Sequence, residues 1–132
     1  MSRGNHCRFC HRSHRAFAEA VALPAELQVA QQLFDADQPI DLAGLSPKMQ
    51  ALLALAEQVR ADATRVTVAH FDAARQHGAD DETLHNTVLI AAAFCMFNRY
   101  VDGLGNFAPE ANDPAYADMA QKITAHGYGA SV

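Results

Sequence analysis

The stretch DDETLHNTVLIAAAFCMFNRYVDGLG, residues 80–105, decides the fold. An acidic N-cap, at Asp80 or Asp81, and the glycines at its end predict a helix over 82–102, the longest in the chain. The middle of this helix, 88–97, is apolar on all sides. In a water-soluble domain such a helix is expected to be enclosed by other helices.

The rest of the chain has the same helical pattern, because no segment alternates apolar and polar residues for long enough to indicate a sheet. A chain of 132 residues forms one domain. We therefore predict a single-domain all-α fold over 1–132, with about six helices around the buried central helix. The other helices are expected over 5–21, 25–34, 47–59, 68–77 and 115–126.

Composition excludes several functional classes. Half of the residues are apolar and 19% are charged, so the chain is expected to fold rather than stay disordered. The net charge of −5 argues against a nucleic-acid partner, which normally needs a basic patch. The first residues, MSRGNHC, have no apolar signal core, and no apolar run approaches the roughly 20 residues of a membrane span. We expect a cytoplasmic protein without membrane partners.

The sequence CRFCHRSH, residues 7–14, carries the chemistry. On a helix, Cys7, Cys10 and His14 lie in one narrow stripe, with His11 beside it. Thiols with this spacing close a disulfide with each other, and His14, one turn after Cys10, can accept its proton. Cytoplasmic thiols are kept reduced, so this pair is expected to be catalytic, redox-sensing or metal-binding.

The surroundings favour a reactive thiolate. If the helix begins near Asn5, its dipole stabilises a thiolate at Cys7. The arginines at 3, 8, 12 and 15 are expected to lower the thiol pKa values further, although they also fit the solvated face of a first helix.

Two other interpretations remain open at this point. One is a zinc site built from His6, Cys7, Cys10, His11 and His14, but a tetrahedral site usually takes a second ligand pair from elsewhere, and the sequence has no second C-x-x-C. The other is that the cysteines are incidental. C-x-x-C alone is weak evidence, and His14 at this offset strengthens it.

Three segments in this order resemble the alkylhydroperoxidase-D-like (AhpD-like) and carboxymuconolactone decarboxylase superfamily, most closely its peroxidase-related branch. They are NHCRFCHRSH (5–14), LSPKMQALLALAEQV (45–59) and VTVAHFDAARQHGADDETLHNTVLIAAAFCMFNRYVDGLG (66–105). The resemblance implies an AhpD-like helical fold, assembly as a homo-oligomer, a trimer or hexamer in much of the family, and peroxide reduction by the cysteine pair.

Carried onto this chain, the resemblance makes Cys10 the peroxidatic thiolate, Cys7 the resolving thiol and His14 part of the proton relay. It implies an antioxidant role in which a small hydroperoxide is the substrate and an external dithiol, such as a reductant protein, reopens the Cys7–Cys10 disulfide. No bound cofactor or metal is expected. The order of the two cysteines stays open, because the helix dipole favours a thiolate at Cys7 while His14 favours one at Cys10.

Non-enzymatic and lyase functions are the alternatives. The dithiol of a small helical oligomer can serve as a redox sensor or binding module. Decarboxylation of a muconolactone is disfavoured, because the decarboxylases of this superfamily work without a C-x-x-C pair.

The chain departs from the family pattern in two places. Active members carry a Glu about a dozen residues before the first cysteine, whereas Met1 lies six residues before Cys7. We therefore expect the chain to lack the family's N-terminal helix. Either the true start of the chain lies further upstream, or another carboxylate such as Glu57 is a substitute, or the peroxidase function has decayed. Phe9 replaces the family's Tyr or His and cannot pass a proton. Both differences predict a slower enzyme.

Three residues near the end of the central helix are expected to have structural rather than catalytic roles. Cys95, inside the apolar run, is expected in the core as a small hydrophobe. Asn98 and Arg99 match an Asn-Arg pair of the family and are assigned structural roles, with Arg99 binding helix carbonyls or a carboxylate.

Overall fold

The structure, a computed structural model, describes residues 1–23, 27, 31 and 42–127. This part of the chain is helical and contains no strand, which confirms the all-α prediction. It has five α-helices, and none of its helices is long and apolar enough to cross a membrane. The helix expected over 25–34 falls almost wholly outside the described residues, so the total of about six stays a prediction. The elements are α1 (Arg8–Val21), α3 (Pro47–Asp62), the 3₁₀ helix η1 (Ala63–Arg65), α4 (Val68–Arg75), α5 (Asp81–Gly103) and α6 (Pro114–His126).

Helix starts follow the capping residues closely. The Ser46 hydroxyl accepts a hydrogen bond from the Met49 amide at 3.2 Å, and the Asp80 carboxylate accepts one from the Thr83 amide at 2.8 Å. Each bond satisfies an N–H that has no partner within its helix. The predicted boundaries of α3 and α5 are accordingly confirmed to within a few residues.

The predicted start of α1 near residue 5 is wrong. The helix begins at Arg8, and Cys7 is its N-cap. Residues 1–7 instead form a compact turn in which His6 has a φ of 60°, in the left-handed region. A helix cannot continue through such a residue, so Cys7 lies at the junction of the turn and the helix.

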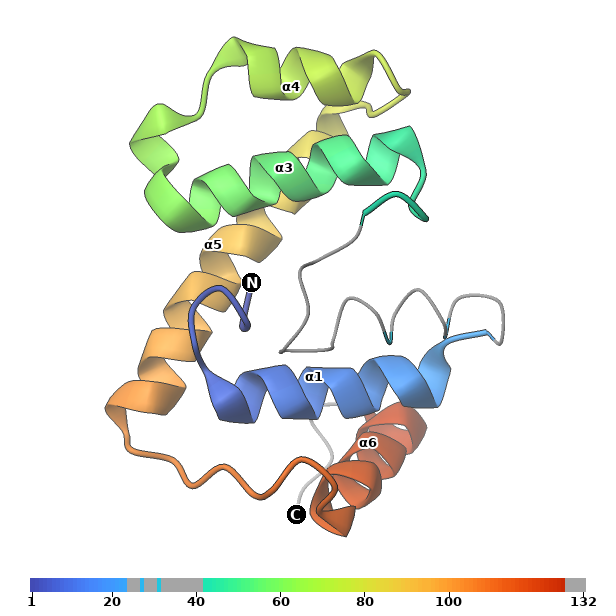
Figure 1. Cartoon of the computed structure of the whole chain (residues 1–132), viewed down its shortest axis with the longest axis vertical. Helices are drawn as coiled ribbons and strands as arrows, with labels where there is room; N and C mark the ends of the chain where they lie inside the picture. The colour runs from blue at the N-terminus through green and yellow to red at the C-terminus, as the bar shows by residue number, and fades with distance from the viewer. Residues whose placement is uncertain (24–26, 28–30, 32–41, 128–132) are drawn as a thin grey trace.

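The described helices form two packed groups (Figure 1). Helix α3 packs against both α4 and α5, while α6 packs against α1. A smaller contact joins α1 to α5, near the N-terminal turn. The main hydrophobic core lies in the first group and consists of Leu52, Leu55, Ala74, Ala79 and Leu84.

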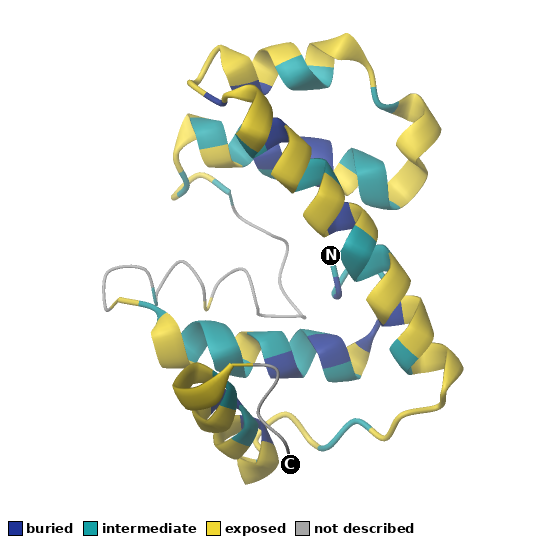
Figure 2. Ribbon diagram, turned by 180° about the vertical axis from the view of Figure 1, so that it is seen from behind, coloured by how far each residue is buried: buried dark blue, intermediate teal, exposed yellow. Residues whose placement is uncertain are grey.

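Among the residues that the structure describes, helix α5 is covered on one side only. Its buried residues are Leu84, Ala91 and Asn98. Figure 2 shows exposed positions along the other side of the helix. The expectation that other helices enclose α5 is therefore wrong for the described part of a single chain, because an apolar pattern does not reveal which surface covers it. The exposed face of α5 comprises Leu89, Ile90, Met96, Phe97 and Tyr100, each 54–64% exposed.

Candidate active site

The two cysteines of the C-x-x-C motif lie together at the N-terminal end of α1. Cys7 is fully buried, and Cys10, in the first turn of the helix, is 6% exposed. Both are free thiols, and the Cys7 thiol lies within hydrogen-bonding reach of the Cys10 thiol. The three-residue spacing thus brings two reduced, enclosed sulfurs next to each other.

Burial makes Cys7 a weak acid. Loss of solvent raises the pKa of its thiol to about 12, and the neighbouring Cys10 thiol and the Asp102 carboxylate act in the same direction. The expectation that the helix N-terminus would hold Cys7 as a thiolate is therefore wrong, because burial outweighs the dipole. Asp102 has no signal in the sequence, because its approach to Cys7 depends on how α5 packs against the turn.

Two of the four arginines near the motif have other partners. Arg12 donates a hydrogen bond to the Pro109 carbonyl and lies 3.8 Å from the Glu110 carboxylate. Arg15 pairs with Glu19 at 2.8 Å. Arg12 thus binds the segment that precedes α6, and Arg15 binds another residue of α1. Neither side chain offsets the burial of Cys7.

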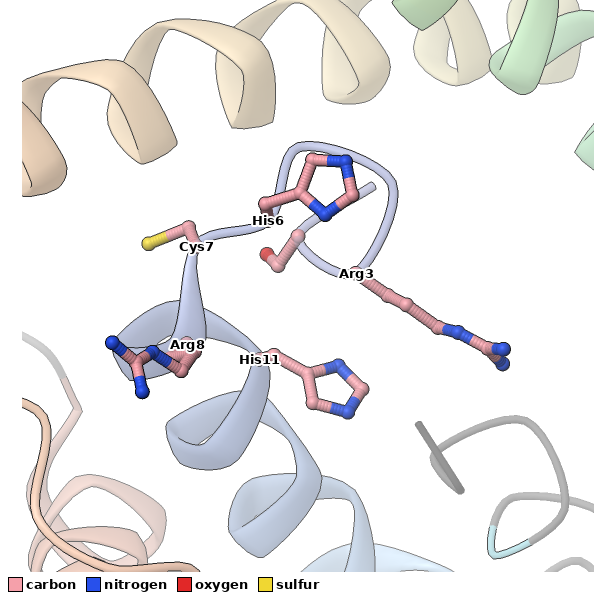
Figure 3. A pocket seen from close by; sticks show the side chains of 6 residues that line it. Arg3, His6, Cys7, Arg8 and His11 are labelled. Atoms are coloured by element: carbon pink, nitrogen blue, oxygen red, sulfur yellow. The ribbon is translucent and has the colours of Figure 1, made fainter. Parts of the chain in front are cut away.

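A cavity of about 550 Å³ opens beside the start of α1. Figure 3 shows that the Cys7 sulfur points away from the side chains of Arg3 and His11. Cys7 is one of the lining residues, although it has no exposed surface. The lining residues are Ser2, Arg3, His6, Cys7, Arg8 and His11.

A second cavity, of about 470 Å³, contains His14. The His14 ring packs against Phe94, with centroids 4.8 Å apart, and burial lowers its pKa. The imidazole is therefore held neutral near pH 7, the form that can accept a proton. His11 lines both cavities and so lies between the surroundings of Cys7 and those of His14. In sequence, the only sign of this position was that His11 lies beside the Cys–Cys–His stripe.

Glu57 supplies a carboxylate to the second cavity. Its hydrogen bonds with Arg60, one of them 2.8 Å from Nε to Oε2, lower its pKa, so it stays ionised at neutral pH. Arg60 also donates to the Gly4 carbonyl at 2.8 Å, which fixes the pair beside the N-terminal turn. Glu57 and His14 line one cavity, as the hypothesis of a substitute carboxylate requires.

The remaining candidates have structural contacts. Arg99 donates to the Cys95 carbonyl at 2.9 Å, in agreement with its predicted binding of helix carbonyls. Cys95 is half-buried rather than a core residue, and its sulfur accepts a hydrogen bond from Asn5 Nδ2 at 3.5 Å. Asn98 is 1% exposed.

The zinc interpretation gains no support from the geometry. Within the described ranges, no group of three or more His, Cys, Asp and Glu side chains is arranged to hold a metal ion. His6 is exposed on the turn, whereas the two sulfurs are buried.

Comparison of the chain with protein-family models, with curated proteins and with solved structures finds no match in any of the three.

Proposed function

We propose that this chain is a cytoplasmic, thiol-dependent hydroperoxide reductase of the alkylhydroperoxidase-D-like type, with Cys7 and Cys10 as its redox pair. The observation that carries the proposal is the pair of adjacent, enclosed, reduced sulfurs at the start of a helix. The neutral His14 and the ionised Glu57 in the neighbouring cavity supply groups able to move protons.

The raised pKa of Cys7 favours Cys10 as the attacking thiol. At pH 7 a thiol with a pKa of about 12 is a thiolate in only about one molecule in 10⁵. The Cys10 thiolate attacks the terminal peroxide oxygen, the O–O bond breaks, and the organic oxygen leaves as an alkoxide that takes a proton to become an alcohol. Cys10 is oxidised to a sulfenic acid.

Cys7 then resolves the sulfenic acid. Its sulfur attacks the Cys10 sulfur, the S–O bond breaks, and the hydroxide that leaves takes up a proton from solvent to become water. The Asp102 carboxylate beside Cys7 accepts the thiol proton as the new S–S bond forms. An external dithiol reduces the disulfide and returns both thiols to the starting state.

Peroxide turnover tests the proposal. The wild-type protein, supplied with dithiothreitol, is expected to consume many equivalents of cumene hydroperoxide or hydrogen peroxide. Cys10→Ser is expected to abolish this turnover, and Cys7→Ser to stop after one equivalent, with a sulfenic acid on Cys10. Cys95→Ser, which removes the third thiol, is the control and is expected to keep its activity.

Other outcomes separate the alternatives. One stoichiometric oxidation of the wild type without turnover indicates a redox sensor. Stable sulfenic acid on Cys7 in the Cys10→Ser variant contradicts the order of the two thiols. Loss of activity in Cys95→Ser contradicts the choice of redox pair.

We further propose that the exposed face of α5 binds the same face of a second copy in a homo-oligomer. Leu89 and Phe97 are separated by eight residues, so an antiparallel, two-fold pairing centred on Ala93 places each Leu89 against the partner's Phe97. A self-complementary apolar face of this kind is typical of a subunit contact. An apolar face is covered best by another apolar surface. The same face of a second copy is such a surface.

Light scattering coupled to size-exclusion chromatography tests this contact. We expect a mass that is a multiple of 14.3 kDa for the wild type and a shift toward 14.3 kDa for Phe97→Glu. Val68→Glu is the matched control, because Val68 is a 70% exposed apolar residue on α4. A monomeric wild type, or dissociation by Val68→Glu alone, contradicts the proposed contact.

A further inference from the structure

The N-terminal turn places Cys7. Its backbone bonds run from the Asn5 amide to the Met1 carbonyl at 2.9 Å, and from the Cys7 amide to the Ser2 carbonyl at 3.0 Å. The turn leads directly into the N-cap position of α1. The position and enclosure of the Cys7 sulfur therefore depend on the turn keeping this conformation.

This conformation needs external support. His6 has a φ of 60°, which is unfavourable for a residue with a β-carbon. Few apolar side chains in the turn are buried. The turn nevertheless lies close to α3, since a Cβ added at Gly4 would be 2.5 Å from Arg60 Nε. Polar contacts from neighbouring helices must therefore fix the turn.

Asn98 of α5 makes two of these contacts. Its Nδ2 donates to the Ser2 hydroxyl at 3.1 Å, and its Oδ1 accepts from Asn5 Nδ2 at 2.9 Å. The amide is almost completely buried, so bulk water does not replace a hydrogen bond that is broken there. One side chain near the C-terminal end of α5 thus binds both the beginning and the middle of the turn.

We propose that Asn98 is a positioning residue for the thiol pair, acting through Ser2 and Asn5 to keep the Cys7 sulfur enclosed beside Cys10. Its role in the disulfide step rests on the proposed function. The enclosure of Cys7 does not, since it is a property of the reduced protein. Without Asn98, both hydrogen bonds to the turn are broken, the Cys7 thiol becomes accessible to solvent, and its pKa falls toward the ordinary value for cysteine.

The pH profile of thiol alkylation tests the proposal. The rate at which iodoacetamide modifies Cys7, followed by peptide mass spectrometry, is expected to reach half its maximum near pH 12 in the wild type. In Asn98→Ala the midpoint shifts down by at least one unit, and the rate at pH 8 rises at least about tenfold. Asn86→Ala, an exposed amide on the same helix, is the matched control and is expected to leave both unchanged.

A second variant separates positioning from loss of stability. Leu84→Ala weakens the α3–α5 core away from the turn and is expected to leave the midpoint of the Cys7 profile in place. If Asn98→Ala fails to fold, Ser2→Ala and Asn5→Ala each remove one of the two hydrogen bonds, and each is expected to shift the midpoint in the same direction.

Each outcome supports or overturns the positioning role. An unchanged midpoint in Asn98→Ala, or in both turn variants if Asn98→Ala does not fold, overturns it. An equal shift in Leu84→Ala overturns it as well. A shifted midpoint in a protein that shows no peroxide turnover supports the positioning role and contradicts the proposed function.

Discussion

Replacing Cys7 by Ser is expected to remove a loss of stability that the wild-type protein shows above pH 9. The pKa of the Cys7 thiol is about 12 in the folded chain against 9.0 for an ordinary thiol. Between pH 9 and pH 12 the folded state keeps the thiol proton, and the unfolded state releases it. The folded state therefore binds more protons, and its stability falls as the pH rises.

The expected slope is about 1.4 kcal/mol per pH unit, or about 4 kcal/mol across the whole window. Urea unfolding of the reduced protein at several pH values between 8 and 11 measures it. Tyr116, whose pKa burial also raises, contributes equally to the wild type and to Cys7→Ser, so the difference between the two isolates the thiol. Parallel curves for the two proteins would show that the Cys7 thiol titrates normally.

Leu55→Ala is expected to lower the free energy of unfolding by about 2 to 5 kcal/mol. Leu55 is fully buried in the core cluster between α3, α4 and α5. Truncation removes its apolar contacts and leaves a cavity that packed helices fill only in part. Thermal or urea unfolding at neutral pH, monitored by the helical circular dichroism signal, measures the change.

Leu104→Ala is the matched control for this core substitution. Leu104 is 62% exposed just beyond the end of α5, so the same truncation is expected to change stability by less than about 0.5 kcal/mol. Similar losses of stability for the two variants would mean that Leu55 does not lie in the main core.

Local features of the fold were readable from the sequence. Ser46 and Asp80 cap helices where their residue types predict, because an N-cap depends on residues three positions apart. Leu52 and Leu55 lie in the core, and their three-residue spacing puts them on one face of α3. Cys7 and Cys10 lie together for the same reason, since a three-residue spacing keeps two side chains close at a helix start.

The turn before α1 was less predictable. His6 has a left-handed conformation in a turn whose Gly4 carbonyl accepts a hydrogen bond from Arg60 of α3, and a contact between residues so far apart in the chain leaves no local signal in the sequence. The start of α1 is consequently predicted too early. The predicted low pKa of Cys7 is wrong for a separate reason, because burial raises the pKa of its thiol.

The sequence by itself determined the all-α class, most helix boundaries and the proximity of the two thiols, because these depend on neighbours within a few residues. Only the tertiary structure decided that Cys7 is buried beside Asp102, that Asn98 holds the turn and that one face of α5 is exposed. Each of these depends on which distant segments meet. Burial sets both the pKa of a thiol and the free-energy cost of breaking a hydrogen bond. It arises only where distant segments pack together, so no single segment determines it.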